Sequence, residues 1–388
     1  MNQPIARPTD RTAAGFTLIE LIVSTAIMMV IVGATMTALN EAVKTNQTAL
    51  QLTSMNNTLR IGLDLMVRDL LQVGQGLPSG RVIQNPSGAG SVQINLPGPP
   101  MGAGVTTTYK NVLGDPDTSA VTPGWQKGPI INGVRTDMIT VLEGDGSFER
   151  MNLTALNNQR MTVALPPGVG TLDISTNGPN DVLPGQLMML VKGSNSTLVQ
   201  VTTVDGAQTA FFAANDSLML NQTAAATGNI TALLNAAPPA VGGNDVPSPP
   251  SNFVPTTAYR IRMISYYIDA VTSPAHPRLI RRMNNGDPMT FNNNLGNVVA
   301  FDVENLRITY DLADGVTNPS NVNMTPNDQA GTGACAPNPC NMNQIRKVNI
   351  ALSGRSRLPI PGARVQFLHN QLQTQVSLRS LAFVDRYR

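Results

Sequence analysis

Charged residues, histidine and cysteine are scarce in this sequence, and each scarcity argues against a class of function. Charged side chains make up 13% of the 388 residues and the net charge is +2, which gives no electrostatic basis for nucleic-acid binding. The two histidines, His276 and His369, have no spacing suited to metal binding, and two thiols alone fall short of a four-ligand zinc site. No nucleophile elbow, Walker loop or dinucleotide fingerprint occurs. We therefore expect no catalytic residue, no metal, no cofactor and no enzymatic activity.

Proline is absent from the first helical part of the chain, between Phe16 and Val73. The 29 prolines and 33 glycines are instead concentrated after residue 74, where they mark turns and loops. Abundant Asn, Thr and Ser with little charge suit a β-rich domain outside the cytoplasm. The chain is long enough for more than one compact unit.

A long apolar run extends from Phe16 to Leu39, and its single ionisable residue is Glu20. A bilayer core about 30 Å thick is spanned by about 20 helical residues, so the run predicts a transmembrane helix. A carboxylate inside such a helix is costly without a partner, which makes Glu20 a candidate functional residue.

An amphipathic pattern continues the helix beyond the membrane through residues 40–77. One apolar stripe recurs at spacings of three and four residues, formed by Leu52, Met55, Leu59, Leu63, Met66, Leu70 and Val73. Gly74, Gly76 and Pro78 then predict the helix end. The pattern therefore predicts one helix from Phe16 to Val73, about 87 Å long, whose second half packs against a globular domain.

The stretch Gly15-Phe16-Thr17-Leu18-Ile19-Glu20 resembles the processing site of type IV pilins and type II secretion pseudopilins. The resemblance implies cleavage by the prepilin peptidase between Gly15 and Phe16, N-methylation of Phe16, and an assembly role for Glu20 at the terminus of a neighbouring subunit. Residues 1–15 would be the leader, and their arginines favour the cytoplasmic side. An ordinary signal peptide has a shorter apolar core and a cut on its far side, and a plain signal anchor leaves Glu20 unexplained.

A second resemblance, to PilW-type minor pilins and the related J-type pseudopilins, rests on Asn57–Ile61, Leu65–Leu70 and the strand order of the C-terminal block. It implies a pilin-like α+β fold, in which the long helix packs on an antiparallel sheet and an additional β-rich subdomain is present. Arg68 and Asp69, just before the helix end, are predicted to be a solvated or capping pair. Many major pilins have a proline within the span, and its absence here argues against local melting of the helix.

The remaining chain divides into four blocks by composition. Residues 78–135 read as Gly/Pro-rich loops, 136–235 as a β-rich subdomain, 236–256 as a linker and 257–388 as the C-terminal sheet of the pilin-like domain. Residues 136–222 are expected to close into a small barrel or sandwich. Predicted strands are Asp137–Leu142, Met161–Leu165, Leu187–Val191, Thr197–Thr202, Leu218–Leu220, Tyr259–Ile268, Arg278–Arg282, Val303–Tyr310 (within Val298–Tyr310), Val348–Ser353 and Gln373–Leu381.

Two further features outside the helix have alternative interpretations. Cys335 and Cys340 lie in a loop, where a local disulfide is the default outside the cytoplasm and free thiols are the alternative. Asp302 and Glu304 alternate on one strand face, where they would contact a cation or, more simply, solvent.

These observations predict a minor pilin of a type IV pilus, anchored by a single span in the bacterial inner membrane with its C-terminal domain outside. Its partners would be the prepilin peptidase and other pilin or pseudopilin subunits, contacted through the N-terminal helix. The alternatives are a J-type pseudopilin of type II secretion, or a membrane-anchored surface binding protein or enzyme that uses the pilin-like segment for export. No ligand of the 136–235 block is indicated.

Overall fold

The computed structural model describes most of the helix and of the sheets that follow it. Described are residues 15–77, 83–84, 96–99, 117–192, 195–214, 216–221, 230, 233, 256–284, 296–312, 345–360 and 367–382. Residues 1–14 of the leader, nearly all of the predicted linker, and both Cys335 and Cys340 lie outside this set.

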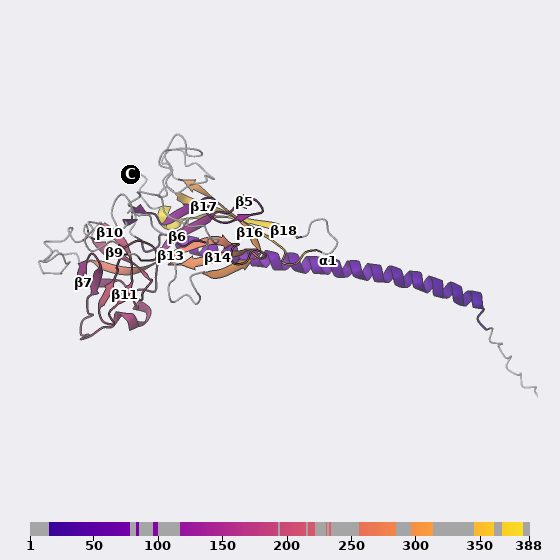
Figure 1. The fold of residues 1–388 in the computed structure, drawn as a ribbon, viewed down its shortest axis with the longest axis horizontal. Helices are drawn as coiled ribbons and strands as arrows, with labels where there is room; N and C mark the ends of the chain where they lie inside the picture. The colour runs from indigo at the N-terminus through magenta and orange to yellow at the C-terminus, as the bar shows by residue number, and fades with distance from the viewer. Residues whose placement is uncertain are drawn as a thin grey trace, which may run out of the picture.

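A single helix, α1 (Leu18–Gln72, 55 residues), forms the first part of the molecule. At 1.5 Å per residue it is about 82 Å long. Its N-terminal half projects from the β-rich body as a free rod, and its C-terminal part is packed against that body (Figure 1). The first buried side chain is Met55, followed on the same stripe by Leu59, Met66 and Leu70. The predicted helix is thus confirmed, although it begins at Leu18 with Thr17 as the N-cap and ends at Gln72, rather than extending from Phe16 to Val73.

The helix ends where the sequence places its glycines. Gly74 has a φ of +76°, in the left-handed region that favours glycine. A Cβ at this position would also lie 2.8 Å from Leu381 Cδ2. Gly74 therefore both stops the helix and permits close packing.

The strands after the helix are mostly short. In the first half they are β1 (Ile83–Gln84), β2 (Asp117–Thr118), β3 (Val121–Gly124), β4 (Ile130–Ile131), β5 (Val134–Arg135), β6 (Met138–Gly144), β7 (Met151–Asn157), β8 (Arg160–Val163), β9 (Leu187–Lys192), β10 (Asn195–Gln200), β11 (Thr203–Val204) and β12 (Thr209–Phe211). In the second half they are β13 (Thr257–Asp269), β14 (Arg278–Met283), β15 (Asn297–Phe301), β16 (Val303–Leu312), β17 (Ile345–Arg355) and β18 (His369–Ser377). Two 3-10 turns, η1 (Ile174–Thr176) and η2 (Gly178–Asn180), and the short helix α3 (Arg379–Ala382) complete the described elements.

The longest strand, β13, organises the largest sheet. It pairs antiparallel with the next strand, β14, and with β6, β7 and β9, which precede it by more than 60 residues in the sequence. A separate three-stranded sheet has the order β16-β17-β18, and β4 pairs with β5. All described ladders are antiparallel except the short pair of β1 with β10. The fold is α+β, as predicted.

Two hydrophobic cores lie on opposite faces of the β6-β13-β14 layer. Successive strand residues point to opposite faces, and on β13 Ile264 and Tyr266 join the core that contains α1, whereas Met263 and Tyr267 join the other. The three-stranded sheet contributes to the α1 core, and β7 to β10 contribute to the second core. The helix and the middle block are therefore held by one shared layer.

The helix approaches the sheets closely at Gly62. A Cβ there would lie 3.1 Å from both Ala300 Cβ and Leu279 Cδ2. The absence of a side chain lets α1 approach β14 and β15. The apolar stripe thus packs on strands, as the sequence predicts.

Several sequence expectations differ from the structure. The predicted strand Leu218–Leu220 is instead a turn, because the Asp216 carboxylate accepts hydrogen bonds from the backbone of Leu218, Leu220 and Asn221. The stretch Val298–Tyr310 is divided between two sheets at Asp302, whose φ is +58°.

The loop block 78–135 contains the short strands β1 to β5, and all four residues of β3 are buried along the edge of β6. Residues 136–222 do not close into a barrel of their own. Three of their strands, β6, β7 and β9, pair with β13 from the C-terminal block.

Candidate functional site

The predicted cleavage site lies on exposed chain immediately before α1. Phe16 is 86% exposed, and no atom lies within 4 Å of where a Gly15 Cβ would stand. Thr17, the N-cap residue, has extended backbone (φ −75°, ψ 150°). The bond between Gly15 and Phe16 is therefore accessible to a peptidase in this chain. Cleavage and methylation themselves remain predictions.

Glu20 is bound to the start of its own helix. Its Oε2 accepts hydrogen bonds from the Thr17 backbone N–H (3.0 Å) and hydroxyl (2.9 Å). The Glu20 N–H in turn donates to Thr17 Oγ1 at 3.4 Å. Together these bonds form a capping box, whose signature is Ser or Thr followed three residues later by Glu or Gln.

The sequence contains the capping-box signature as Thr17-Leu18-Ile19-Glu20. The sequence-based prediction gave Glu20 only an assembly role. The box satisfies two backbone donors that a helix start leaves unpaired. In lipid, where water is absent, such donors are costly. The Glu20 carboxylate therefore has a local function before any second subunit is present.

The apolar half of α1 is exposed on every side. The described structure contains one helix long and apolar enough to cross a membrane, and no residue of its most apolar window is buried. The hydroxyl groups of Ser24, Thr25, Thr35 and Thr37 donate to backbone carbonyls three or four residues earlier. These polar groups are thus satisfied within the helix, as a lipid environment requires.

The C-terminal end of α1 is held to the sheet by Asp69. Its Oδ2 accepts hydrogen bonds from the Tyr266 hydroxyl (2.6 Å) and from Arg281 Nε (2.5 Å). Tyr266 and Arg281 are direct partners in the β13-β14 ladder, so both side chains reach the same face. The prediction of a solvated or capping pair is correct for Arg68, which is exposed, and wrong for Asp69, which is buried.

Burial controls the chemistry of this anchor. It raises the pKa of Tyr266, and the neighbouring Asp69 charge and hydrogen bond raise it further. The phenol therefore stays protonated and remains a donor to Asp69.

A second charged cluster lies near the end of β6. Asp145 binds Arg260 Nε at 2.7 Å and an Arg262 terminal nitrogen at 2.8 Å. Burial opposes ionisation of Asp145, but hydrogen bonds from Ser147 and the charge of Arg262 outweigh it and lower its pKa. Glu143 lies 3.7 Å from Arg262, and burial together with the Asp69 charge raises its pKa.

Both histidines lie beside the acids singled out in the sequence. His276 Nδ1 is 2.6 Å from Asp302 Oδ1, and His369 Nδ1 is 3.0 Å from Glu304 Oε2. Arg355 also contacts Glu304, at 3.4 Å. The expectation of a solvated acidic face is therefore wrong, because His276 lies against Asp302, and Arg355 and His369 lie against Glu304. In the described part of the chain no group of three or more His, Cys, Asp or Glu is arranged to hold a metal.

Comparison with protein families identifies one motif. Residues 10–36 match the prokaryotic N-terminal methylation motif, the prepilin-type head of type IV pilin-like proteins. The match covers Gly15, Phe16 and Glu20 but none of the sheets. It supports a substrate of the prepilin peptidase and, with the apolar helix, membrane anchoring through the N-terminus. No curated protein and no solved structure matches the chain.

Proposed function

We propose that this chain is a minor pilin of a type IV pilus. It is cut between Gly15 and Phe16, methylated on Phe16, and drawn from the inner membrane into the filament or its priming complex. Its role is structural, with no enzymatic activity and no cofactor. The C-terminal domain lies outside the cytoplasm throughout.

The observation that carries the proposal is the division of α1 into two halves. The first half is apolar and exposed on every side, with one carboxylate four residues after the predicted new terminus. The second half buries its stripe in the α1 core. A helix that is fully exposed over its apolar part needs lipid before assembly and the helices of other subunits afterwards.

Glu20 supports an ordered assembly in this proposal. In the low-dielectric interior of a helix bundle, an unpaired carboxylate is strongly unfavourable, and a neighbour's methylated ammonium would compensate it. The Glu20 carboxylate would then move from its own Thr17 to the partner's terminus. This pairing would set the axial position of one subunit relative to the next.

Mass spectrometry of the mature chain tests the processing step. The expected product begins at N-methylated Phe16 and co-purifies with other pilin subunits. A mature chain that still begins at Met1 would overturn the proposal.

Three variants separate the two functions of Glu20. Glu20→Gln keeps the hydrogen bonds of the capping box but removes the charge, and Thr17→Ala removes the side-chain cap but keeps the charge. Glu20→Ala removes the charge and the carboxylate's hydrogen bonds to Thr17, while the Thr17 hydroxyl still caps the backbone N–H of residue 20. We expect all three to be cleaved, Glu20→Gln and Glu20→Ala to enter filaments poorly, and Thr17→Ala to enter far better than either. Incorporation of Glu20→Gln at the wild-type level would contradict the charge-pairing role.

The second candidate is a J-type pseudopilin of type II secretion, which the same helix would serve equally well. The subunits recovered with the mature chain distinguish the two assemblies. The third is a membrane-anchored surface binding protein or enzyme, for which the 136–235 block would supply the active surface. Recovery of the mature chain without any other pilin-like subunit would favour this last function.

A further inference from the structure

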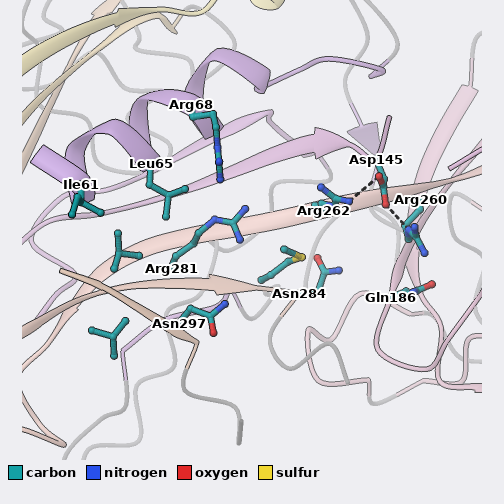
Figure 2. Close-up of a pocket in the computed structure, with 13 residues that line it drawn as sticks. Ile61, Leu65, Arg68, Asp145, Gln186, Arg260, Arg262, Arg281, Asn284 and Asn297 are labelled. Atoms are coloured by element: carbon teal, nitrogen blue, oxygen red, sulfur yellow. Dashed lines mark hydrogen bonds and ion pairs between the residues drawn. The ribbon is translucent and has the colours of Figure 1, made fainter. Parts of the chain in front are cut away.

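A cavity of about 620 Å³ lies between α1 and the face of the central sheet that the helix covers. This volume is within the range of about 300–1,000 Å³ typical of small-molecule sites. Its lining comes from α1, from β13 and β14, and from β15 (Figure 2). The proposed pilin function does not use this cavity.

The charged lining of the cavity is predominantly cationic. Four guanidinium groups, those of Arg68, Arg260, Arg262 and Arg281, face one carboxylate, that of Asp145. Asp145 is already bound by Arg260 and Arg262, as the dashed lines in Figure 2 show. Arg260 also binds Asp181 at 3.1 Å, so these two arginines are largely engaged.

Arg68 and Arg281 have fewer acidic partners than Arg260 and Arg262, because both share Asp69, although Arg281 also lies beside the Tyr266 hydroxyl. Arg281 uses Nε for Asp69, and no other ion pair of its guanidinium occurs among the described residues. Arg68 lies 3.9 Å from Asp69 through Nε, and its side chain is 67% exposed. Figure 2 shows the two side chains converging from α1 and β14 on the same space. Two guanidinium groups thus share the carboxylate of Asp69, and both line the cavity.

Acids behind the lining balance the charges of the arginines, since Asp181 binds Arg260 and Glu143 lies beside Arg262. Asp69 is buried under Arg281 and is shared by Arg68 and Arg281. Glu143 is buried beside Arg262, and its Oε2 has no hydrogen-bond partner among the described residues.

The rest of the lining has polar side chains, those of Gln186, Asn284 and Asn297, and apolar side chains. Leu65 and Ile61 extend from the helix, and Met283, Val298 and Val299 extend from β14 and β15. Ile61 remains 62% exposed and lies at the opening. A ligand that fills this space would have an apolar part against these side chains and an anionic part against the arginines.

We propose that this cavity binds a small organic carboxylate that carries an apolar group. A carboxylate matches the planar donor fork of a guanidinium and accepts two hydrogen bonds from it. The carboxylate of the ligand would lie between the guanidinium groups of Arg68 and Arg281, which line the cavity together. The apolar group displaces water from Ile61, Leu65 and the valines of β15.

Binding of 4-phenylbutyrate to the full chain in detergent micelles tests this proposal. Saturation-transfer NMR with a calorimetric titration gives the affinity, and the neutral amide of the same compound is the matched ligand control. We expect the acid to bind at least roughly tenfold more tightly than the amide, which corresponds to the loss of one charge-assisted contact.

The variant Arg68→Gln removes the more exposed of the two guanidinium groups that share Asp69. We expect it to weaken 4-phenylbutyrate binding about tenfold and to leave the melting temperature unchanged. Arg60→Gln is the matched control, because Arg60 is an exposed arginine of the same helix that does not line the cavity. It should bind as the wild type does.

A second probe, acetyl-Gly-Gly-Phe, shows whether a peptide carboxyl terminus supplies the carboxylate more effectively than a free acid. Tighter binding of either probe than of its amide supports the proposal, and their ratio identifies the source. The proposal fails if neither acid binds saturably up to about 10 mM. It also fails if acid and amide bind equally, or if Arg68→Gln binds like Arg60→Gln.

Discussion

At the scale of single residues, two carboxylates of α1 show how environment determines function. Glu20 lies in the apolar half and is satisfied by Thr17, three residues away. Asp69 is satisfied by Tyr266 and Arg281, about 200 residues away in the chain. A local partner is readable in the sequence as a motif, whereas a distant one depends on the pairing of β13 with β14. Glu20 could be predicted as a site from its place in the apolar run and in the prepilin-like motif, whereas no local pattern marks Asp69.

Substitution of Asp69 by Asn should destabilise the globular domain. Arg281 would lose its only ion pair among the described residues, and breaking a buried pair of this kind costs about 2–3 kcal/mol when one partner is partly exposed. Chemical denaturation followed by circular dichroism measures the change. Asp64→Asn is the control, because Asp64 is exposed on the same helix and should alter stability by less than about 0.5 kcal/mol. Equal stability of the two variants would contradict the anchor.

Glu143 makes stability depend on pH in a defined direction. Its pKa is raised above the ordinary 4.5 by burial and by the Asp69 charge, so the folded chain favours the protonated acid. The contribution of Glu143 is therefore fully present below pH 4.5 and is lost as the pH rises through the raised pKa. Glu143→Gln, which stays neutral, should match the wild type at low pH and become the more stable of the two above that range. Denaturation curves across about pH 4–8 measure this, and a constant difference would exclude the titration of Glu143.

At the scale of elements, the helix and the longer strands were predictable because their patterns are local. The stripe from Met55 to Leu70 repeats with helical spacing. Residues 259–268, which alternate at first and are rich in β-branched and aromatic side chains, lie in β13. Two failures also have local physical causes. The Asp216 carboxylate binds backbone N–H groups and makes a turn of an apolar triplet, and Asp302 in the left-handed region divides a continuous run.

Gly62 provides a test of how α1 meets the sheets. In Gly62→Leu, even the Cβ of the new side chain would lie 3.1 Å from Ala300 Cβ. Overpacking of this kind costs about 1–3 kcal/mol. Gly33→Leu is the matched control, because it gains the same helix propensity and meets open space. Thermal denaturation should show a lower melting temperature for Gly62→Leu only. An unchanged melting temperature would show that α1 does not approach the strands so closely.

At the scale of the whole molecule, the structure combines one free rod with a two-core body. The division into blocks by composition does not predict this arrangement, because β13 from the last block pairs with strands of the middle block. Strand pairing over long separations depends on the entire chain and leaves no local signature.

Removal of the free part of the helix should leave the body intact. No hydrophobic side chain before Met55 is buried among the described residues, so a chain that begins at residue 45 should be monomeric and should melt within a few degrees of the full chain. A chain that begins at residue 60 loses Met55 and Leu59 from the core, and should be less stable by about 4 kcal/mol or more. Size-exclusion chromatography and circular dichroism compare the two. Aggregation of the chain that begins at residue 45 would show that the body depends on the exposed half of α1.

The position of β13 has a consequence for the order in which the chain acquires structure. Strands β6 and β9 are complete by residue 192, yet the strand that pairs with both does not begin until Thr257. During synthesis from the N-terminus, their hydrogen-bonding edges toward β13 stay open until the chain has passed residue 269. Closing such long loops is slow, and open edges favour association with other chains. In the interval between emergence of β9 and emergence of β13, the chain is therefore most exposed to association with other chains.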